Sequence, residues 1–423
     1  MFKLLKGRLS HYIKDDLIRH TAIVFVGTSV VGIFNLIYHL ISVRLLTPED
    51  YGTFNALIAL VMFTSMTVSP LAPTLTRFFT EYITKKDFDT LKSVCIKLVK
   101  RILGISILFI FFFALFSQSI AEFFKTEASY IVICGVVIGV SLLSLVFPAL
   151  FQSFQKFKTY SLMGIISSFA KLVVGAALMY LGWSILGGLS GYLVAPVVIL
   201  IISLVIIFKV YRENISEVKS SKTISLVPIY KYFFPVAVVI FSFTVLTYID
   251  VILVKHFFSP LEAGYYSVAQ VVGKIFLFLP SALAIVMFPK STAAYINNSH
   301  SHKILYKSLL LASILCGIGI IVCFLFPGLV LSVLTSKANP VSIRLVGLFS
   351  LAMTFYALLW LVINYLIATH NLKIALFLLF LASCEAILIY VWHPSLITIL
   401  YTLVAFSVVT FLFSLYFVRT RKE

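Results

Sequence analysis

Long apolar segments alternate with short polar ones along the whole chain. Each apolar segment has about 20 residues or more, which is the length that an α-helix needs to cross the hydrocarbon core of a bilayer. The pattern predicts twelve membrane-spanning helices, at residues 20–43, 53–76, 98–118, 129–152, 160–182, 187–208, 232–254, 264–288, 305–326, 343–367, 373–392 and 395–418.

Composition supports this interpretation. The chain is 61% hydrophobic and 11% charged, with a mean hydropathy of +1.10, whereas soluble domains carry about 25% charged residues. We therefore expect an all-α polytopic membrane protein. Because the first apolar segment is long enough to span and basic residues precede it, we expect no cleavable signal peptide.

Charge predicts the orientation. The formal net charge of +18 reflects basic loops, which in membrane proteins lie mainly in the cytoplasm, so we expect no nucleic-acid partner. If the N-terminus lies in the cytoplasm, most Lys and Arg residues fall in cytoplasmic segments and both termini are cytoplasmic. We expect the protein to lie in the plasma membrane. Residues 1–17 mix apolar and basic positions at helical spacing and predict an interfacial helix. The segments assigned to the outside hold only Arg44, Lys125, Lys255 and Lys337, together with Arg344 at the start of the tenth predicted span.

The chain repeats itself. "TPEDYG" at residues 47–52 matches "SPLEAG" at 259–264, an offset of 212 residues that is half the chain length. The widest polar gap, 209–231, lies between the copies. We therefore predict two six-helix lobes, residues 1–212 and 213–423. Parallel repeats of this kind are typical of transporters that bind substrate between the halves.

The repeated motif itself predicts a shaped turn. Ser/Thr-Pro ends one helix and begins the next, and acidic residues favour the positive N-terminal end of the second helix. Gly52 and Gly264 would allow a close approach of two helices.

Enzyme motifs are absent from the sequence. It contains no GxxxxGK[ST], HExxH or GxSxG pattern, and its five cysteines occur singly, without a CxxC pair. We expect neither an enzyme nor a bound cofactor or metal.

The motifs "RLLTPEDYGTFNAL", "KHFFSPLEAGYYSVA" and "ALFQSFQKFK" resemble the polysaccharide transporters (O-antigen or capsule-type flippases) of the multidrug/oligosaccharidyl-lipid/polysaccharide flippase superfamily. The resemblance extends over the whole chain in length, helix count and repeat. It implies a bilobed transporter that flips a polyprenyl-diphosphate-linked oligosaccharide by alternating access for surface polysaccharide biosynthesis. The partners that it implies are that lipid, membrane lipids, and polymerases and glycosyltransferases of the pathway.

An anionic diphosphate needs a cationic cavity, and polar residues inside membrane spans are candidates for its lining. The cationic candidates are Arg44, Arg77, Lys171, Lys255 and Lys274. Arg44 and Lys255 could form a cationic rim at the outer mouth. The polar candidates, which share helix faces, are Asn35, His39, Thr247 and Gln270. If the first, second, seventh and eighth helices line the cleft, these faces point into it.

Two carboxyl groups are candidates for coupling transport to H⁺ or Na⁺. Asp250 and Glu385 lie inside apolar spans, where burial disfavours a charged carboxylate. Lys171 and Glu385 occupy nearly equivalent places in the two halves, which suits either a pair across the lobes or separate roles.

Three other functions stay open. A lipid II flippase shares the superfamily but usually has more than twelve helices. A cation-coupled drug exporter would be expected to carry more carboxylates in its cavity. A membrane glycosyltransferase or polymerase would be expected to show a large, charged outer loop, and the longest one here, about residues 327–342, is poor in charges.

Overall fold

The chain folds almost wholly into helices in a computed structural model that describes residues 16–213, 227–278, 301–369 and 373–419 and the single positions 280, 283, 284, 287 and 291. The first half contains α2 (Asp16–Leu45), α3 (Pro48–Val68), α4 (Leu71–Thr84), α5 (Phe88–Leu115), α6 (Ser117–Phe124), α7 (Ala128–Ser144), α8 (Val146–Ser153), α9 (Phe157–Leu178), the π-helical turn η1 (Met179–Trp183) and α10 (Ser184–Glu213). The second half contains α11 (Val227–Phe257), α12 (Pro260–Phe278), α14 (Ser301–Leu325), α15 (Pro327–Thr335), α16 (Pro340–Ala368), α17 (Ile374–Val391) and α18 (Leu396–Arg419).

These helices confirm the predicted fold class, an all-α multi-pass membrane protein. Nine helical stretches of the described residues are long and apolar enough to cross a membrane, and one of them, Phe157–Ile206, joins two predicted spans through η1. The predicted spans 53–76 and 264–288 are not among the nine. The first is split into α3 and α4 at Ser69 and Pro70, and the second extends beyond the end of α12.

Both copies of the repeated motif begin a helix. The Thr47 hydroxyl accepts a hydrogen bond from the backbone N–H of Asp50 at 3.1 Å, and Pro48 opens α3. In the second copy, Ser259 and Glu262 bond to each other's backbone N–H groups at the start of α12. Each motif is therefore an N-cap, as its sequence predicts.

The two motif glycines lie against each other across the halves. A Cβ atom on Gly52 would lie 2.7 Å from the backbone nitrogen of Gly264, and a Cβ on Gly264 would overlap the carbonyl group of Pro48. Only glycine permits backbones to approach so closely. Each sequence motif places its glycine at this contact, which joins the beginnings of α3 and α12.

Equivalent helices pack in the same way in the two halves. In the first half, α9 packs against α2 and α10, and α7 packs against α5 and α10. In the second, α17 packs against α11 and α18, and α16 against α14 and α18. The largest contact between halves is that of α3 with α11 and α12. The predicted boundary at 212/213 adjoins residues 214–226, which lie outside the described residues, so the boundary stays a prediction.

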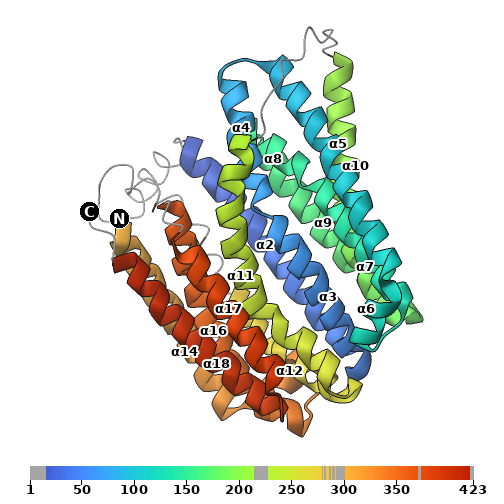
Figure 1. Ribbon diagram of the computed structural model, residues 1–423, viewed down its shortest axis with the longest axis vertical. Coiled ribbons are helices and arrows are strands. Elements are labelled where there is room, and N and C mark those ends of the chain that lie inside the picture. The colour runs from blue at the N-terminus through green and yellow to red at the C-terminus, as the bar shows by residue number, and fades with distance from the viewer. Residues whose placement is uncertain are drawn as a thin grey trace, which may run out of the picture.

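The first turn of α2 and the last turn of α18 lie at one end of the molecule, here called the proximal end (Figure 1). The opposite, distal end holds the start of α3, the start of α12 and the short helices α6 and α15. From the distal end the helices of the two halves diverge toward the proximal end (Figure 1).

Candidate functional site

Five buried polar side chains form a continuous network between the halves. Lys274 of α12 donates from Nζ to Oδ1 of Asn55 in α3 at 2.7 Å, and Nδ2 of Asn55 donates to Oε1 of Gln270 at 2.8 Å. Oδ2 of Asp250 in α11 accepts from Nε2 of Gln270 at 3.1 Å and from the hydroxyl of Tyr266 at 2.9 Å. We call these residues (Asn55, Asp250, Tyr266, Gln270 and Lys274) the interface network.

Three residues of the interface network come from one face of α12. Tyr266, Gln270 and Lys274 lie four residues apart, so they share one face of α12, and that face turns toward α3 and α11. The cation and the carboxylate are joined through Asn55 and Gln270 rather than as an ion pair. Lys274 also lies over the ring of Tyr248, with Nζ 5.5 Å from the ring centroid.

A second buried cation lies within the first half. Nζ of Lys171 in α9 donates to Oδ1 of Asn35 in α2 at 2.5 Å. The same Nζ lies 4.0 Å from the ring centroid of Tyr192 and 4.8 Å from that of Tyr38, within the range of a cation–π attraction. The hydroxyl of Tyr192 lies 3.2 Å from Nε2 of His39. The polar face of α2 thus contacts α9 and α10 of its own half.

A buried carboxyl group lies within the second half. Oε2 of Glu385 in α17 accepts from the hydroxyl of Tyr356 in α16 at 2.7 Å. Lys171 and Glu385 each bond within their own half, so the prediction of a pair across the lobes is wrong for this conformation. Separate roles, the other prediction, fit the two sites.

Three buried atoms in these clusters accept or donate no hydrogen bond among the described residues. They are Oδ1 of Asp250, Oε1 of Glu385 and Nδ1 of His39. Buried polar atoms are nearly always satisfied, so each can take up a proton, an ion or a ligand group. Among the described residues, no three His, Cys, Asp or Glu side chains come together as a metal site.

Cations at the distal end bond to helix ends of the opposite half. Arg44, in the last turn of α2, donates to the carbonyl groups of Val333 and Leu334 in α15 at 2.6 and 3.3 Å. Lys125, just after α6, donates to the carbonyl of Phe258 at 3.2 Å, and Lys337 donates to the carbonyl of Leu46. Helix C-termini leave such carbonyl groups unpaired and carry negative dipole ends, so cations stabilise them.

These distal contacts follow the repeat. Adding the offset of 212 to Lys125 gives Lys337, and adding it to Leu46 gives Phe258. The two lysine contacts therefore join equivalent positions of the repeat. Arg44 corresponds to His256, whose Nδ1 lies 2.9 Å from the carbonyl oxygen of Phe123 in α6. We call the set Arg44, Lys125, His256 and Lys337 the distal gate. Partial burial lowers the pKa of Lys337 below its ordinary value.

The remaining predicted residues fall in different places. Lys255 is buried at the distal end and donates to the hydroxyl of Thr53 across the halves at 2.7 Å. Arg44 and Lys255 therefore contact the opposite half and do not form an open rim. Thr247 donates to the carbonyl of Phe243 in its own helix at 2.8 Å. The side chain of Arg77 lies outside the described residues.

Sequence reasoning missed Asn55 and the tyrosines. Asn55 is the amide closest to the first repeated motif, and that position was its only signal. Tyr38, Tyr192 and Tyr356 read as ordinary members of apolar spans, because tyrosine is amphipathic and often marks a membrane interface. Their partners could be found only once the rotation of each helix was known.

Solved structures share this fold over nearly the whole chain. A multidrug resistance MATE family transporter of the MOP superfamily, in an inward-facing conformation, matches with a TM-score of 0.72 at 13% identity over 93% of this chain and 96% of its own. Lipid II flippase MurJ, in an inward closed conformation, gives 0.68 at 15% identity over 94% and 88%. A MOP superfamily transporter from Pyrococcus furiosus, described as having a binding pocket of reverse polarity, gives 0.63 at 13% identity over 96% of each chain. No curated protein sequence matches the chain.

The chain therefore has the fold of these MOP superfamily transporters. The sequence profile described as "Polysaccharide biosynthesis protein" matches residues 17–294, which is well over half of the chain. The chain belongs to this polysaccharide biosynthesis protein family, and the resemblance predicted from its motifs is confirmed.

Proposed function

We propose that this protein flips a polyprenyl-diphosphate-linked oligosaccharide from the cytoplasmic to the outer leaflet of the plasma membrane. Family membership supports a substrate from polysaccharide biosynthesis. The observation that carries the proposal is the position of Lys274, a buried cation that bonds across the halves to an uncharged amide. An uncharged acceptor is a weak partner for an ammonium group, and a phosphate oxygen is a stronger one.

The geometry gives alternating access a mechanism. Within the described residues, the hydrogen bonds between the halves lie in the interface network, at Lys255 and Thr53, and in the distal gate. A diphosphate that reaches Lys274 from the proximal side would replace Asn55 as its partner. The halves would then lose a central connection, which would favour opening at the distal end. Lys171 would offer a second cation inside the first half, while the polyprenyl chain stays in the bilayer.

The free carboxyl oxygens provide a means of coupling. Asp250 belongs to the interface network through Tyr266 and Gln270, so its charge affects the bonds that hold the halves together. Glu385 lies in α17, which packs against α11, the helix that carries Asp250. Binding of H⁺ or Na⁺ to these carboxyl groups would change the charge beside the interface network and link an ion gradient to the conformational change. The proximal end is then the cytoplasmic end, with both termini in the cytoplasm.

A drug exporter or a lipid II flippase of the same fold is the alternative. The two carboxyl groups in the second half are the observation that favours an exporter of cationic compounds, because a cation would pair with the free oxygens of Asp250 and Glu385. The two cationic sites, Lys171 and Lys274, favour an anionic substrate.

The experiment is to delete the gene and measure lipid-linked oligosaccharide by mass spectrometry, separated by leaflet accessibility. We expect glycan-diphosphate-lipid to accumulate on the cytoplasmic face. Complementation with Lys274→Ala should restore about a tenth or less of the wild-type flipping, since a charge-assisted bond contributes about a factor of ten or more. The matched control Lys100→Ala, which removes an exposed cation of α5, should complement fully.

Two outcomes would contradict the proposal. An unchanged lipid profile together with altered resistance to cationic drugs would support the exporter. Accumulation of lipid II alone would support the lipid II flippase.

A further inference from the structure

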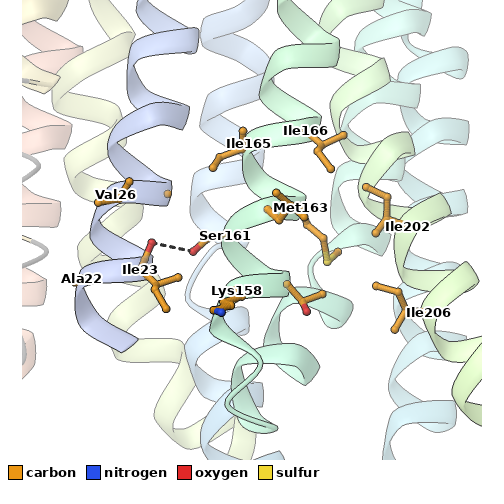
Figure 2. Close-up of a pocket in the computed structure, with 13 residues that line it drawn as sticks. Ala22, Ile23, Val26, Lys158, Ser161, Met163, Ile165, Ile166, Ile202 and Ile206 are labelled. Carbon is orange, nitrogen blue, oxygen red and sulfur yellow. Dashed lines mark hydrogen bonds between the residues drawn. The ribbon is translucent and has the colours of Figure 1, made fainter. Parts of the chain in front are cut away.

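An apolar groove lies over the outer face of α9, with α2 and α10 as its side walls (Figure 2). Its volume is about 1000 Å³. Ile23 and Val26 line it from α2, Leu162 and Ile166 from α9, and Ile202 from α10. Val26 and Leu162 are 58% and 57% exposed, so the groove opens outward from the protein. In a membrane-spanning chain, such an opening faces lipid.

The groove has one cationic end. Figure 2 shows Lys158 at one end and Ile165 and Ile166 at the other. Lys158 lies in the first turn of α9, and Lys156 is the residue just before that helix. Both side chains are exposed, and neither has a hydrogen-bond or ion-pair partner among the residues that the structure describes. Lys158 lines the groove, and its free ammonium group complements an anionic headgroup.

The apolar face continues beyond the groove along the same helix. Leu162, Ile166, Phe169 and Val173 follow one another at spacings of four, three and four residues and are between 41% and 57% exposed. At 1.5 Å per residue, this stripe together with Lys158 extends over roughly 20 Å of helix. The groove thus has a charged end at the membrane surface and an apolar stripe that runs toward the bilayer interior. This arrangement matches the headgroup and chain of a lipid in one leaflet.

We propose that this groove binds the polyprenyl chain of a polyprenyl diphosphate in the proximal leaflet, with the diphosphate at Lys158. This inference rests on the proposed function and adds a loading site outside the bundle, separate from the cations between and within the halves. Lys171 lies nine residues after Leu162, which turns it to the opposite, buried face of α9. The loading site therefore holds the lipid before its headgroup reaches the buried cations.

The test uses the full-length protein in vesicles of a zwitterionic phospholipid with a photoreactive polyprenyl diphosphate that carries no sugar. After illumination, peptide mass spectrometry locates the adducts. We expect them on α2 and α9, at or next to Val26, Leu162 and Ile166. Replacing Lys158 by Ala should lower the labelling about tenfold, since a charge-assisted contact is lost. Lys100→Ala should leave it unchanged.

A second variant removes the groove without touching the charges. Ile166→Trp fills the apolar end and should also lower labelling, and Leu162→Trp serves if the first variant does not elute as a folded protein. Equal labelling by a photoreactive phosphatidylglycerol, with mutual competition, would overturn the inference in favour of an ordinary anionic phospholipid. Labelling elsewhere on the protein would overturn it as well.

The two proposals fail separately because the probe has no sugar. Labelling in the groove by a protein that does not flip lipid-linked oligosaccharide would contradict the proposed function and support the lipid site. Flipping by a protein that is not labelled in the groove would contradict only the lipid site.

Discussion

Asn55 is the residue that joins the halves at their centre. Its amide accepts from Lys274 and donates to Gln270, both on α12, while Asn55 itself belongs to α3. It is buried, so no water replaces these partners. Removing it leaves a buried ammonium group without its acceptor, and such orphaned charges are among the most costly defects in a protein.

We therefore predict that Asn55→Leu lowers the free energy of unfolding by about 3 kcal/mol. The matched control is Asn364→Leu, because the amide of Asn364 is half-buried and donates to a carbonyl of its own helix. That variant should lose about 1 kcal/mol or less. Thermal unfolding of the purified protein measures both, and equal losses would show that the bridge between halves contributes nothing.

At the same scale, the sequence identified charged members of the site better than uncharged ones. Lys171, Lys274, Asp250 and Glu385 stand out because a charge inside an apolar span is costly unless it has a role. Asn55 and Tyr192 differ little from the helix-packing residues around them. The bond partners depend on how each helix is rotated, which spacing within one helix does not determine.

At the scale of helices, too, the sequence predicted some features and missed others. Hydropathy predicted the long apolar helices of the described residues because burial in lipid requires such helices. It did not predict the breaks at Ser69 and Leu145 or the π-helical turn between α9 and α10, since local bends leave the apolar pattern unchanged. The distal gate was also beyond prediction, because its acceptors are backbone carbonyl groups, which every residue carries.

The glycine contact between α3 and α12 provides a test at the scale of elements. We predict that Gly264→Ala destabilises the protein by about 1–3 kcal/mol, because the new methyl group overlaps the carbonyl of Pro48. Gly317→Ala, in α14, is the control. No atom lies within 4 Å of where its Cβ would be, so alanine there should be neutral or stabilising by up to about 1 kcal/mol.

Thermal unfolding measures the stability of these two variants. The accessibility of the distal end is measured by the rate at which a membrane-impermeant maleimide labels a cysteine at position 53. Thr53 is buried beneath Lys255. Gly264→Ala should raise its labelling rate several-fold, and Gly317→Ala should not. The same result for both glycines would mean that the repeated motifs do not hold the distal end closed.

At the scale of the whole molecule, a buried cation and a buried carboxyl group belong to one hydrogen-bond network. Asp250 bonds to Gln270, which in turn bonds to Asn55 in the other half, and the helix of Asp250 packs against that of Glu385. Under the proposed function, an ion bound there would change the charge near Lys274 and its bridging amides. An ion gradient and the substrate would then act on one set of contacts, which is what alternating access driven by a gradient requires.

We predict that Asp250→Asn combined with Glu385→Gln abolishes the acceleration of flipping by an imposed H⁺ or Na⁺ gradient. Both substitutions keep the shape of the side chain and remove its charge, so substrate should still bind at Lys171 and Lys274. The measurement is the flipping rate in vesicles with and without the gradient. Glu122→Gln, an exposed carboxylate at the distal end, is the control and should respond to the gradient as the wild type does. A full response of the double variant would place the coupling ion elsewhere in the molecule.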